Sequence, residues 1–433
     1  MIEFLLKGLL RDKSRSRIPV IVVSIGVALT VLMHAYITGF MGDIIEINAR
    51  VSYGHLNVMT MGYAGNMQQV PNDLALTDVS SLTGELKKEF PGVEWSPRIQ
   101  FAGLIDAPDE NGETRTQGPA MGIGLDLLDP GSPERKRLNL EGSLVRGHMP
   151  VQQNEVLLSD LFAKKLDVGP GDRVTFIGST MYGSMTIHDY TVAGTVSMGQ
   201  EALDRGMIIA DIADVRMALD MENAAGEILG FFNGGFYDDD VALTRAATFN
   251  EKHAGENGNN DGSSNSSELA PVMRSLSQQG TMGTYVGMTK SWSAYISLVF
   301  IFAMSLVLWN AGLLGGLRRY GEVGIRLAMG EDKGHTYRSM IYEAVMIGLA
   351  GSVIGTVIGL FLAWLLQEYG IDISGIMKGS ALMMPTVIRA NINPVDYYLG
   401  FIPGLISTVI GTMLSGIGIY KRQTARLFKE LEA

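Results

Sequence analysis

The stretch I-P-V-I-V-V-S-I-G-V-A-L-T-V-L-M-H-A-Y-I-T-G-F, residues 18–40, decides the fold, because only small polar residues and one histidine interrupt its apolar run. As a helix rising about 1.5 Å per residue it reaches roughly 35 Å, enough to cross a hydrocarbon core of about 30 Å. Similar runs follow at residues 292–317, 341–366 and 397–420, and nothing comparable lies in residues 45–285. We therefore predict one membrane span, a globular domain outside the bilayer, and three more spans.

The composition agrees with a membrane protein. Charged residues make up 18% of the 433 residues and hydrophobic residues 46%, a balance that is unusual for a fully soluble protein. The chain contains no cysteine, which excludes disulfides, thiolate metal sites and lipid anchors on cysteine. The first apolar run is too long for the core of a signal peptide and no A-x-A cleavage pattern follows it, so we interpret it as an uncleaved anchor.

The charge distribution predicts the orientation. Residues 41–288 hold 34 acidic and 17 basic side chains, and because the whole chain carries −11, the remainder carries +6. Those basic residues cluster before the first span, between the second and third, and after the fourth, and such clusters mark the cytoplasmic side of a membrane. Both termini and the loop after the second span are therefore expected in the cytoplasm, with the large acidic domain outside.

These observations divide the chain into consecutive segments. The predicted segments are an amphipathic helix at residues 1–17 on the inner membrane surface, spans at 18–44, 289–317, 341–368 and 395–420, an outer domain at 45–285, a cytoplasmic loop at 318–340, an outer loop at 369–394 and a cytoplasmic tail at 421–433.

Within the outer domain, predicted strands alternate with single helices, which favours an α+β class. Residues 155–166 are expected to form a strand and then a helix with Ser159 as its N-cap, and residues 269–279 to form a helix leading back to the membrane. A mobile loop is predicted at about residues 250–268, because residues 256–267 carry no apolar side chain and cannot offset the entropy of ordering.

No motif for catalysis or metal binding is present. The sequence lacks a G-x-x-x-x-G-K-[ST] loop, a G-x-S-x-G elbow and an H-E-x-x-H motif, and its six histidines are scattered. Three consecutive aspartates at residues 238–240 could attract Ca²⁺, but without EF-hand spacing we interpret them as a solvated loop. We expect neither an enzyme nor a resident metal or cofactor on this chain.

Small residues recur at intervals of four in the last two spans. Such positions let helices approach closely, so we expect them to hold spans two to four in a tight bundle, with a face for a second subunit as the alternative. These residues are Gly348, Gly351, Gly355, Gly359, Gly404, Gly411 and Ser415.

Two polar residues are expected at membrane depth. Asn310 lies near the cytoplasmic end of the second span and Glu343 near the start of the third. Because polar groups there usually face protein, a structural ion pair with Arg338 or Arg319 is favoured over a role in transport.

The loop between spans two and three begins R-R-Y-G-E-V-G-I-R-L-A-M-G at residue 318. As a helix it places Arg319, Glu322 and Arg326 on one face, where i,i+4 pairs contribute about 0.2–0.5 kcal/mol each. Its cytoplasmic position makes it a candidate docking point for a partner. The candidate residues are Arg319, Glu322, Val323, Arg326, Leu327 and Gly330.

Residues 319–330, R-x-x-E-V-G-I-R-L-A-M-G, resemble the coupling-helix signature of the FtsX/MacB-type permeases, the transmembrane subunits of type VII ABC systems. Those chains share one span, an outer domain and three spans. Glu343 with Gly351 and Gly355 resembles the family's E-x(7)-G-x(3)-G, and residues 1–17 resemble its elbow helix.

The resemblance extends to the outer domain. G-H-L-N-V at residues 54–58 is similar to the LolC/LolE branch, which extracts lipoproteins, and residues 155–172 resemble a motif of both branches. Two features depart from the LolC pattern: G-I-R-L-A-M-G is closer to the MacB variety, and residues 178–185 form only a short turn where LolC-like subunits carry a long chaperone-binding hook.

The resemblance implies an α-helical membrane protein with four transmembrane helices, arranged 1+3, and a large α+β, MacB-like periplasmic domain between helices 1 and 2. It implies a permease of the bacterial inner membrane that moves lipoproteins or other amphiphiles. ATP and Mg²⁺ would bind a separate cytoplasmic P-loop ATPase dimer. Further partners would be a second copy or a related permease, membrane lipid, and an adaptor or chaperone, but no nucleic acid. The alternatives are MacB-like efflux and FtsX-like signalling to a periplasmic hydrolase.

Overall fold

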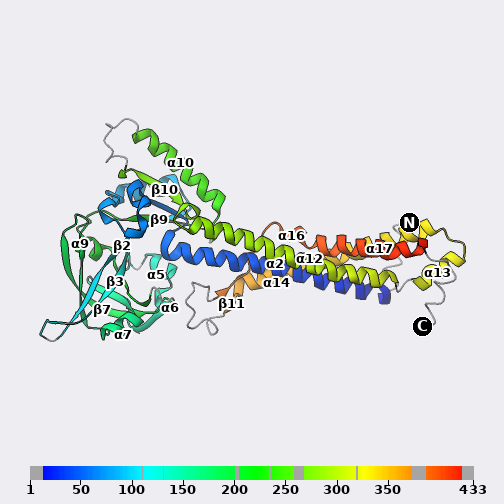
Figure 1. Ribbon diagram of the computed structural model, residues 1–433, viewed down its shortest axis with the longest axis horizontal. Coiled ribbons are helices and arrows are strands. Elements are labelled where there is room, and N and C mark those ends of the chain that lie inside the picture. The colour runs from blue at the N-terminus through cyan, green and yellow to red at the C-terminus, as the bar shows by residue number, and fades with distance from the viewer. Residues whose placement is uncertain are drawn as a thin grey trace. The chain divides into compact units, whose positions relative to one another are not determined.

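The computed structural model describes residues 13–109, 111–129, 131–199, 204–233, 236–257, 268–317, 320–372 and 387–421. The chain divides into two compact units (Figure 1). The first, here called the membrane unit, comprises Met1–Asp43, Met288–Ile373 and Thr386–Ala433, and the second, the outer domain, comprises Ile44–Gly287 and Ser374–Pro385. Most of the predicted amphipathic helix at residues 1–17 lies outside the described residues, as does the tail from residue 422.

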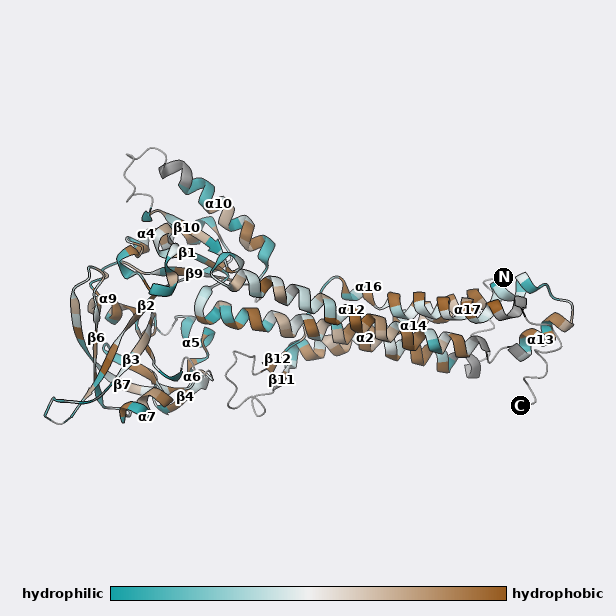
Figure 2. Ribbon diagram, in the orientation of Figure 1, coloured by the Kyte–Doolittle hydropathy of each residue, from teal (hydrophilic) through white to brown (hydrophobic). Residues whose placement is uncertain are grey.

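Within the described residues, four helical segments are long and apolar enough to cross a membrane, and Figure 2 shows their hydrophobic colouring. Each helix continues past its apolar run; α14, for example, begins at Lys333 rather than at residue 341, because Asp332 caps it by accepting from the backbone N–H groups of Gly334 and His335. The bounds are α2 Lys13–Asn48, α12 Met282–Leu317, α14 Lys333–Tyr369, and for the fourth span α16 Asp396–Leu399, the π-helix η5 Ile402–Ser407 and α17 Thr408–Lys421.

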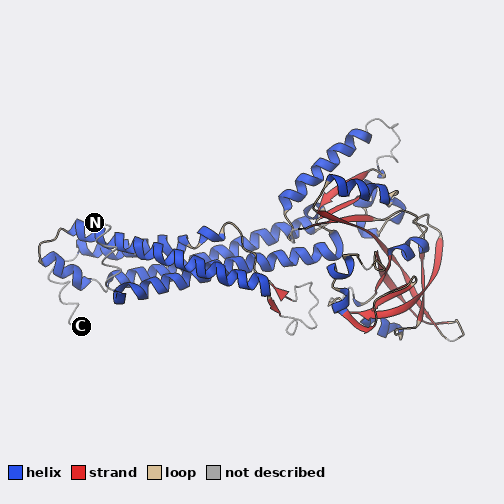
Figure 3. Cartoon of the chain, turned by 180° about the vertical axis from the view of Figure 1, so that it is seen from behind, coloured by secondary structure: helices blue, strands red, loops and turns tan. Residues whose placement is uncertain are grey.

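The outer domain is built on a mixed sheet (Figure 3). Strand β6 pairs with both β2 and β7, so six strands, β2, β3, β8, β5, β7 and β6, form a closed ring of pairings. Strands β9, β1 and β10 extend the sheet from the first half of β2. The strand bounds are β1 Leu56–Thr60, β2 Val93–Pro108, β3 Thr114–Leu125, β4 Leu144–Gly147, β5 Glu155–Ser159, β6 Arg173–Ser179, β7 Met185–Val196, β8 Met207–Asp211, β9 Glu227–Phe232 and β10 Pro271–Ser275.

Short helices lie between these strands, and the domain has one large hydrophobic cluster with smaller ones beside it. Strand β6 alternates buried with more exposed side chains, whereas β5 and β8 are buried along their whole length, which indicates that both faces of the sheet are covered there. The helix bounds are η1 Ala49–Tyr53, α3 Met61–Gly65, η2 Met67–Gln69, η3 Asn72–Leu74, α4 Val79–Glu89, α5 Glu134–Arg137, α6 Leu140–Ser143, α7 Asp160–Leu166, α9 Ile212–Ala218, α10 Asp239–Asn257 and η4 Leu276–Gln278. The core includes Leu56, Trp95, Ile99, Phe101, Phe162, Phe176, Tyr190, Val215, Phe249 and Met273.

The prediction of a helix at residues 269–279 was wrong. The segment forms β10, which pairs antiparallel with β1, and then the 3-10 helix η4. The physical reason is a clamp from outside the segment: the Asn250 side chain donates to the Met273 carbonyl oxygen at 2.9 Å and accepts from the Met273 N–H at 2.8 Å. These long-range hydrogen bonds outweigh the helical pattern of the local sequence.

The hydrogen bonds between Asn250 and Met273 also explain why part of the loop predicted at residues 250–268 is helical. Its first part, through Asn257, belongs to α10, because Phe249 is fully buried and Asn250 is bonded to β10. Residues 258–267 lie outside the described residues. Ser159 does occupy the N-cap position of α7, but its hydroxyl makes no capping bond and donates instead to the Asp204 carbonyl oxygen at 2.6 Å.

Candidate functional site

The loop between the second and third spans contains a short amphipathic helix, α13, at Tyr320–Ala328. Val323 is only 3% exposed and packs with Leu327 against Met340 of α14. The helix ends at Gly330, whose φ of +94° is open to glycine, and the N–H of Glu331 bonds back to the Arg326 carbonyl oxygen. The apolar face of α13 therefore attaches it to the membrane unit.

The opposite face of α13 presents a mixed surface. Ile325 is 47% exposed, and Met329 just after the helix is 75% exposed. Arg326, which lies between them in the sequence, is exposed as well. Of the candidate coupling residues, Val323 and Leu327 thus point inward and Arg326 outward, while Arg319 lies outside the described residues. The sequence interpretation missed Ile325 and Met329, although their spacing of four is the signal of a shared helical face.

Three glycines of α14, Gly351, Gly355 and Gly359, lie against the first span, which was not among the spans that the sequence interpretation assigned to them. A Cβ built on Gly351 would meet Val23, one on Gly355 would lie 2.5 Å from the Ser24 carbonyl oxygen, and one on Gly359 would lie 2.9 Å from the Ala28 carbonyl oxygen. Close approach of two helix backbones at small residues is the packing that lipid-embedded helices favour.

The remaining small residues lie in the fourth span or face it. Gly348 faces Gly404 and Leu405, and a Cβ on Gly411 would lie 2.5 Å from the Trp309 carbonyl oxygen of α12. Ser415 is buried and its hydroxyl donates to the Thr412 carbonyl oxygen. These contacts and those of α14 bring all four spans of the membrane unit together.

The loop that leads into the fourth span crosses α2 at Gly39. A Cβ at Gly39 would collide with the Arg389 carbonyl oxygen, and the Asn391 N–H donates to the Ala35 carbonyl oxygen at 2.9 Å. Nearby, His34 Nδ1 and Asp396 Oδ1 are 2.6 Å apart. Sequence reasoning passed over both, because His34 reads only as an interruption of an apolar run.

In the outer domain, α2 enters the first strand through a π-helical turn. After η1, Gly54 adopts a φ of +64°, and a Cβ there would lie 2.6 Å from a backbone carbonyl oxygen. Arg98 of β2 donates from Nη1 to the Val51 carbonyl oxygen at 2.8 Å and from Nη2 to the Arg50 carbonyl oxygen at 2.9 Å. A buried cation thereby binds carbonyl groups that the end of the helix leaves without intrahelical partners.

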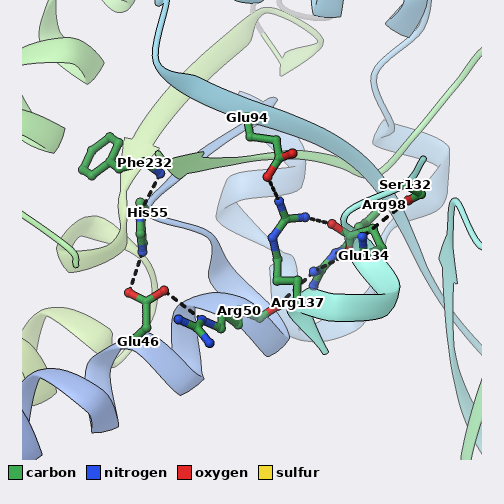
Figure 4. Close-up of polar contacts among 9 residues, drawn as sticks. All are labelled: Glu46, Arg50, His55, Glu94, Arg98, Ser132, Glu134, Arg137 and Phe232. Carbon is green, nitrogen blue, oxygen red and sulfur yellow. Dashed lines mark hydrogen bonds and ion pairs between the residues drawn. The ribbon is translucent and has the colours of Figure 1, made fainter. Parts of the chain in front are cut away.

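Arg98 is held in turn by a buried carboxylate (Figure 4). Glu134 Oε2 accepts from Arg98 Nη2 at 2.7 Å and from Nε at 3.1 Å, and the two residues are 0% and 3% exposed, respectively. Arg137 pairs with both Glu134 and Glu94. Burial lowers the pKa of Arg98 to about 10, which leaves the guanidinium charged at neutral pH.

A second contact fixes the same helix end. Glu46 accepts from Arg50 Nε at 2.9 Å and from His55 Nε2 at 2.8 Å, while His55 Nδ1 accepts from the Phe232 N–H at 3.0 Å (Figure 4). These partners place the imidazole proton on Nε2. His55, the residue before β1, therefore links β9 to the last turns of α2.

The beginning of α12 is tied to the same place through Gln279. Its Nε2 donates to the Tyr53 carbonyl oxygen at 3.1 Å, and its Oε1 accepts from Asn57 Nδ2 at 3.0 Å. Asn57 also donates to Glu227 Oε2 at 2.5 Å, and Gln100 donates to Glu227 Oε1 at 2.8 Å. We use the name junction for the buried residues Arg98, Glu134, Glu227 and Gln279 together with their hydrogen-bond partners. The junction bonds both connecting helices to the sheet.

Burial raises the pKa of Glu227 to about 7, against an ordinary value of 4.5, and the hydrogen bond from Asn57 opposes this shift. The native domain thus binds more protons than the unfolded chain between about pH 5 and 7, so its stability should fall as pH rises through that window. We expect Glu227→Gln to remove this fall and to be roughly 2–3 kcal/mol more stable than the parent near pH 8. Thermal unfolding of both proteins from pH 5 to 8 measures the two effects.

The matched control is Glu141→Gln, because Glu141 is exposed in the same domain. This variant should keep the parent's pH profile. If the stability of Glu227→Gln still fell with pH as steeply as that of the parent, another group would cause the pH dependence.

Comparisons with known proteins agree with this architecture. Residues 18–242, more than half of the chain, match the MacB-like periplasmic core domain, and residues 294–424 match the FtsX-like permease C-terminal family. The crystal structure of the periplasmic region of MacB from Actinobacillus actinomycetemcomitans is similar with a TM-score of 0.34 and 13% identity, over 54% of this chain and 94% of that one. No curated protein sequence gave a significant match.

Among the described residues, no group of three or more histidine, aspartate or glutamate side chains could hold a metal ion.

The four apolar helices, the mixed-sheet domain between the first and second of them, and the two family matches all describe one kind of protein. The chain belongs to the FtsX/MacB-like permease family, the transmembrane subunits of ABC transporters, which are not themselves the ATPase.

Proposed function

We propose that this permease transmits ATP hydrolysis by a separate cytoplasmic ATPase dimer to its outer domain, and thereby moves lipoproteins or other amphiphiles out of the outer leaflet of the bacterial inner membrane. The observation that carries the proposal is the outward face of α13. Ile325, Arg326 and Met329 form an exposed apolar surface with a cation, on a helix that Val323 fixes to α14. Such a surface suits a groove in a soluble partner.

The junction supplies the second half of the transmission. Arg98 and Glu46 bond the end of α2 to the sheet through charged groups, and Gln279 bonds the start of α12 through neutral ones. Displacement of either helix must therefore move or break buried hydrogen bonds in the outer domain. Breaking a buried pair is costly, so movement of the sheet with the helices is favoured. The proposed orientation has both termini and α13 in the cytoplasm.

A second candidate is MacB-like efflux of peptides or small amphiphiles. It is favoured by the tight turn between β6 and β7, where the Thr180 N–H donates to the Ser184 carbonyl oxygen at 2.7 Å. That turn has no long hook for a lipoprotein chaperone to bind.

Reconstitution in lipid nanodiscs with the partner ATPase tests these functions. Acylated protein, an amphiphilic peptide and a soluble periplasmic hydrolase are each added, and ATP turnover is measured. Stimulation by acylated protein supports the leading proposal, and stimulation by the peptide alone supports efflux. Stimulation only by the hydrolase would replace transport with signalling.

The double variant Ile325→Asp with Met329→Asp should weaken ATPase binding by tenfold or more, because it places two charges in the apolar part of the outward face of α13. Co-purification and ATP turnover of the reconstituted complex measure the effect. Val151→Asp is the control, since Val151 is 72% exposed in the outer domain and should tolerate the charge. Full ATPase binding by the double variant would contradict docking at α13.

A further inference from the structure

Glu227 is a buried carboxyl group in the middle of the junction. It begins β9 and is only 1% exposed. Its oxygens accept from two side-chain amides: Oε1 accepts from Gln100 at 2.8 Å and Oε2 from Asn57 at 2.5 Å. Because burial raises the pKa of Glu227 to about 7, a modest change of pH around neutrality changes its charge.

The other titratable groups that face Glu227 keep their charge over the same range. Burial and the charge of Glu227 raise the pKa values of Tyr53 on η1 and Tyr63 on α3, so both phenols stay neutral. Arg98 on β2 has a pKa of about 10 and stays charged. A pH change near neutrality therefore alters the charge of Glu227 rather than the charges around it.

The hydrogen bonds that begin at Glu227 continue to both connecting helices. Asn57 Nδ2, which donates to Glu227, also donates to Gln279 Oε1 at 3.0 Å. Gln279 Nε2 in turn donates to the carbonyl oxygen of Tyr53, the last residue of η1, which follows α2. The Gln279 carbonyl oxygen accepts from the N–H of Met282, where α12 begins. Two buried amides thus connect one carboxyl group to the end of α2 and the start of α12.

This arrangement of donors suits only an ionised Glu227. An ionised carboxyl group accepts hydrogen bonds and donates none, whereas a protonated one carries an O–H that needs an acceptor. Asn57 supplies one: its Oδ1 is buried and has no hydrogen-bond partner within the described part of the chain. Rotating the Asn57 amide by half a turn presents this oxygen to Glu227. The 2.5 Å separation is short for N–H···O but ordinary for O–H···O, so the rotated amide fits.

Rotation of the Asn57 amide disturbs the next hydrogen bond. Its oxygen then faces Gln279 Oε1, and two acceptors repel each other. If the Gln279 amide rotates as well, its own oxygen faces the carbonyl oxygens of Tyr53 and Ser275, to which its nitrogen now donates. Neither orientation satisfies both ends of Gln279, and unpaired buried polar groups are costly. Protonation of Glu227 therefore favours release of Gln279 from Tyr53.

We propose that the junction is a proton-operated latch. With Glu227 ionised, Gln279 bonds the start of α12 to the end of α2; with Glu227 protonated, the Asn57 amide rotates and releases that bond. Only the consequence rests on the proposed function: acid on the side of the outer domain loosens the connection through which ATP hydrolysis reaches that domain.

Hydrogen exchange of the intact protein in lipid nanodiscs measures the latch between pH 6 and 9, with each rate corrected for intrinsic exchange at that pH. We expect protection at Met282 and the first turn of α12 to fall at least fivefold from pH 8 to 6. Protection in β2 should not fall, because protonation of Glu227 stabilises the domain as a whole. The infrared band of the protonated carboxyl group, identified by its loss in Glu227→Gln, reports the charge of Glu227 independently.

Asn57→Leu and Gln100→Met form a matched pair, because each removes one amide that donates to Glu227 and keeps a similar side-chain shape. Both should shift the infrared titration to higher pH. Exchange at α12 should stay slow at every pH in Asn57→Leu, and it should still follow the infrared titration in Gln100→Met. Gln279→Met provides a second test if Asn57→Leu does not fold: its α12 should exchange fast at every pH.

The latch is overturned if Glu227 shows no infrared titration, or if it titrates while protection of α12 in the parent stays constant. A pH response that survives in Asn57→Leu, or that disappears in Gln100→Met, also overturns it. ATP turnover with the partner ATPase separates this proposal from the proposed function. A latch that opens without any change in cargo-stimulated turnover rejects transmission through the junction alone, and stimulated turnover with constant protection of α12 rejects the latch alone.

Discussion

Arg98→Met is expected to lower the free energy of unfolding of the outer domain by about 3–5 kcal/mol, the usual cost of removing one partner of a buried ion pair. Glu134 would keep its charge at 0% exposure and retain only Arg137 as a cation. The carbonyl groups of Arg50 and Val51 would also lose the donors that Arg98 supplies. Methionine fills a similar volume, so the loss reports on charge and hydrogen bonds rather than on a cavity.

Hydrogen exchange on the intact protein measures this loss, because exchange in β2 reports the stability of the domain and exchange at the end of α2 reports the junction. Arg115→Met is the matched control: Arg115 pairs with Asp167 at 3.4 Å, but both side chains are exposed, and such pairs contribute about 0–1 kcal/mol. Equal protection of β2 in the two variants would show that the buried pair does not stabilise the domain.

Hydropathy and composition alone could predict the four spans and the mixed domain. An apolar run as long as the first span has few interpretations other than a transmembrane helix. Strands β3 and β6 alternate as half-buried strands do, whereas β1, β5 and β8 are buried throughout. Position 273 shows the limit: the hydrogen bonds between Asn250 and Met273 turn a helical pattern into β10, and no local window contains both residues.

The junction was beyond sequence reasoning for a related reason. Arg98 and Glu134 are 36 residues apart, Glu134 lies in a run of charged residues, and no periodicity relates the two. Gly39 also gave no signal, because its role depends on a backbone segment about 350 residues later in the chain. The glycines of α14 were identified by their spacing, but spacing does not reveal which helix they contact.

Gly355→Leu is expected to lower the free energy of unfolding of the membrane unit by about 3 kcal/mol, in the upper part of the range for overpacking. A Cβ at this position would lie 2.5 Å from the Ser24 carbonyl oxygen and 2.7 Å from Val27 Cβ. Neither atom can move away by a change of rotamer, because one is backbone and the other is bonded directly to it. Helices α2 and α14 must therefore separate, and the contacts at Gly351 and Gly359 weaken with them.

The control is Gly315→Leu, the same substitution on α12, where a Cβ would meet no atom within 4 Å. Leucine there should be neutral or stabilising by up to about 1 kcal/mol, since it favours a helix more than glycine does. The thermal midpoint in one detergent, and the exchange protection of α2, distinguish the two variants. If both behave alike, the small residues of α14 are not required for packing on α2. If only Gly355→Leu loosens α2, that contact joins α14, against which α13 packs, to α2, the helix that enters the outer domain.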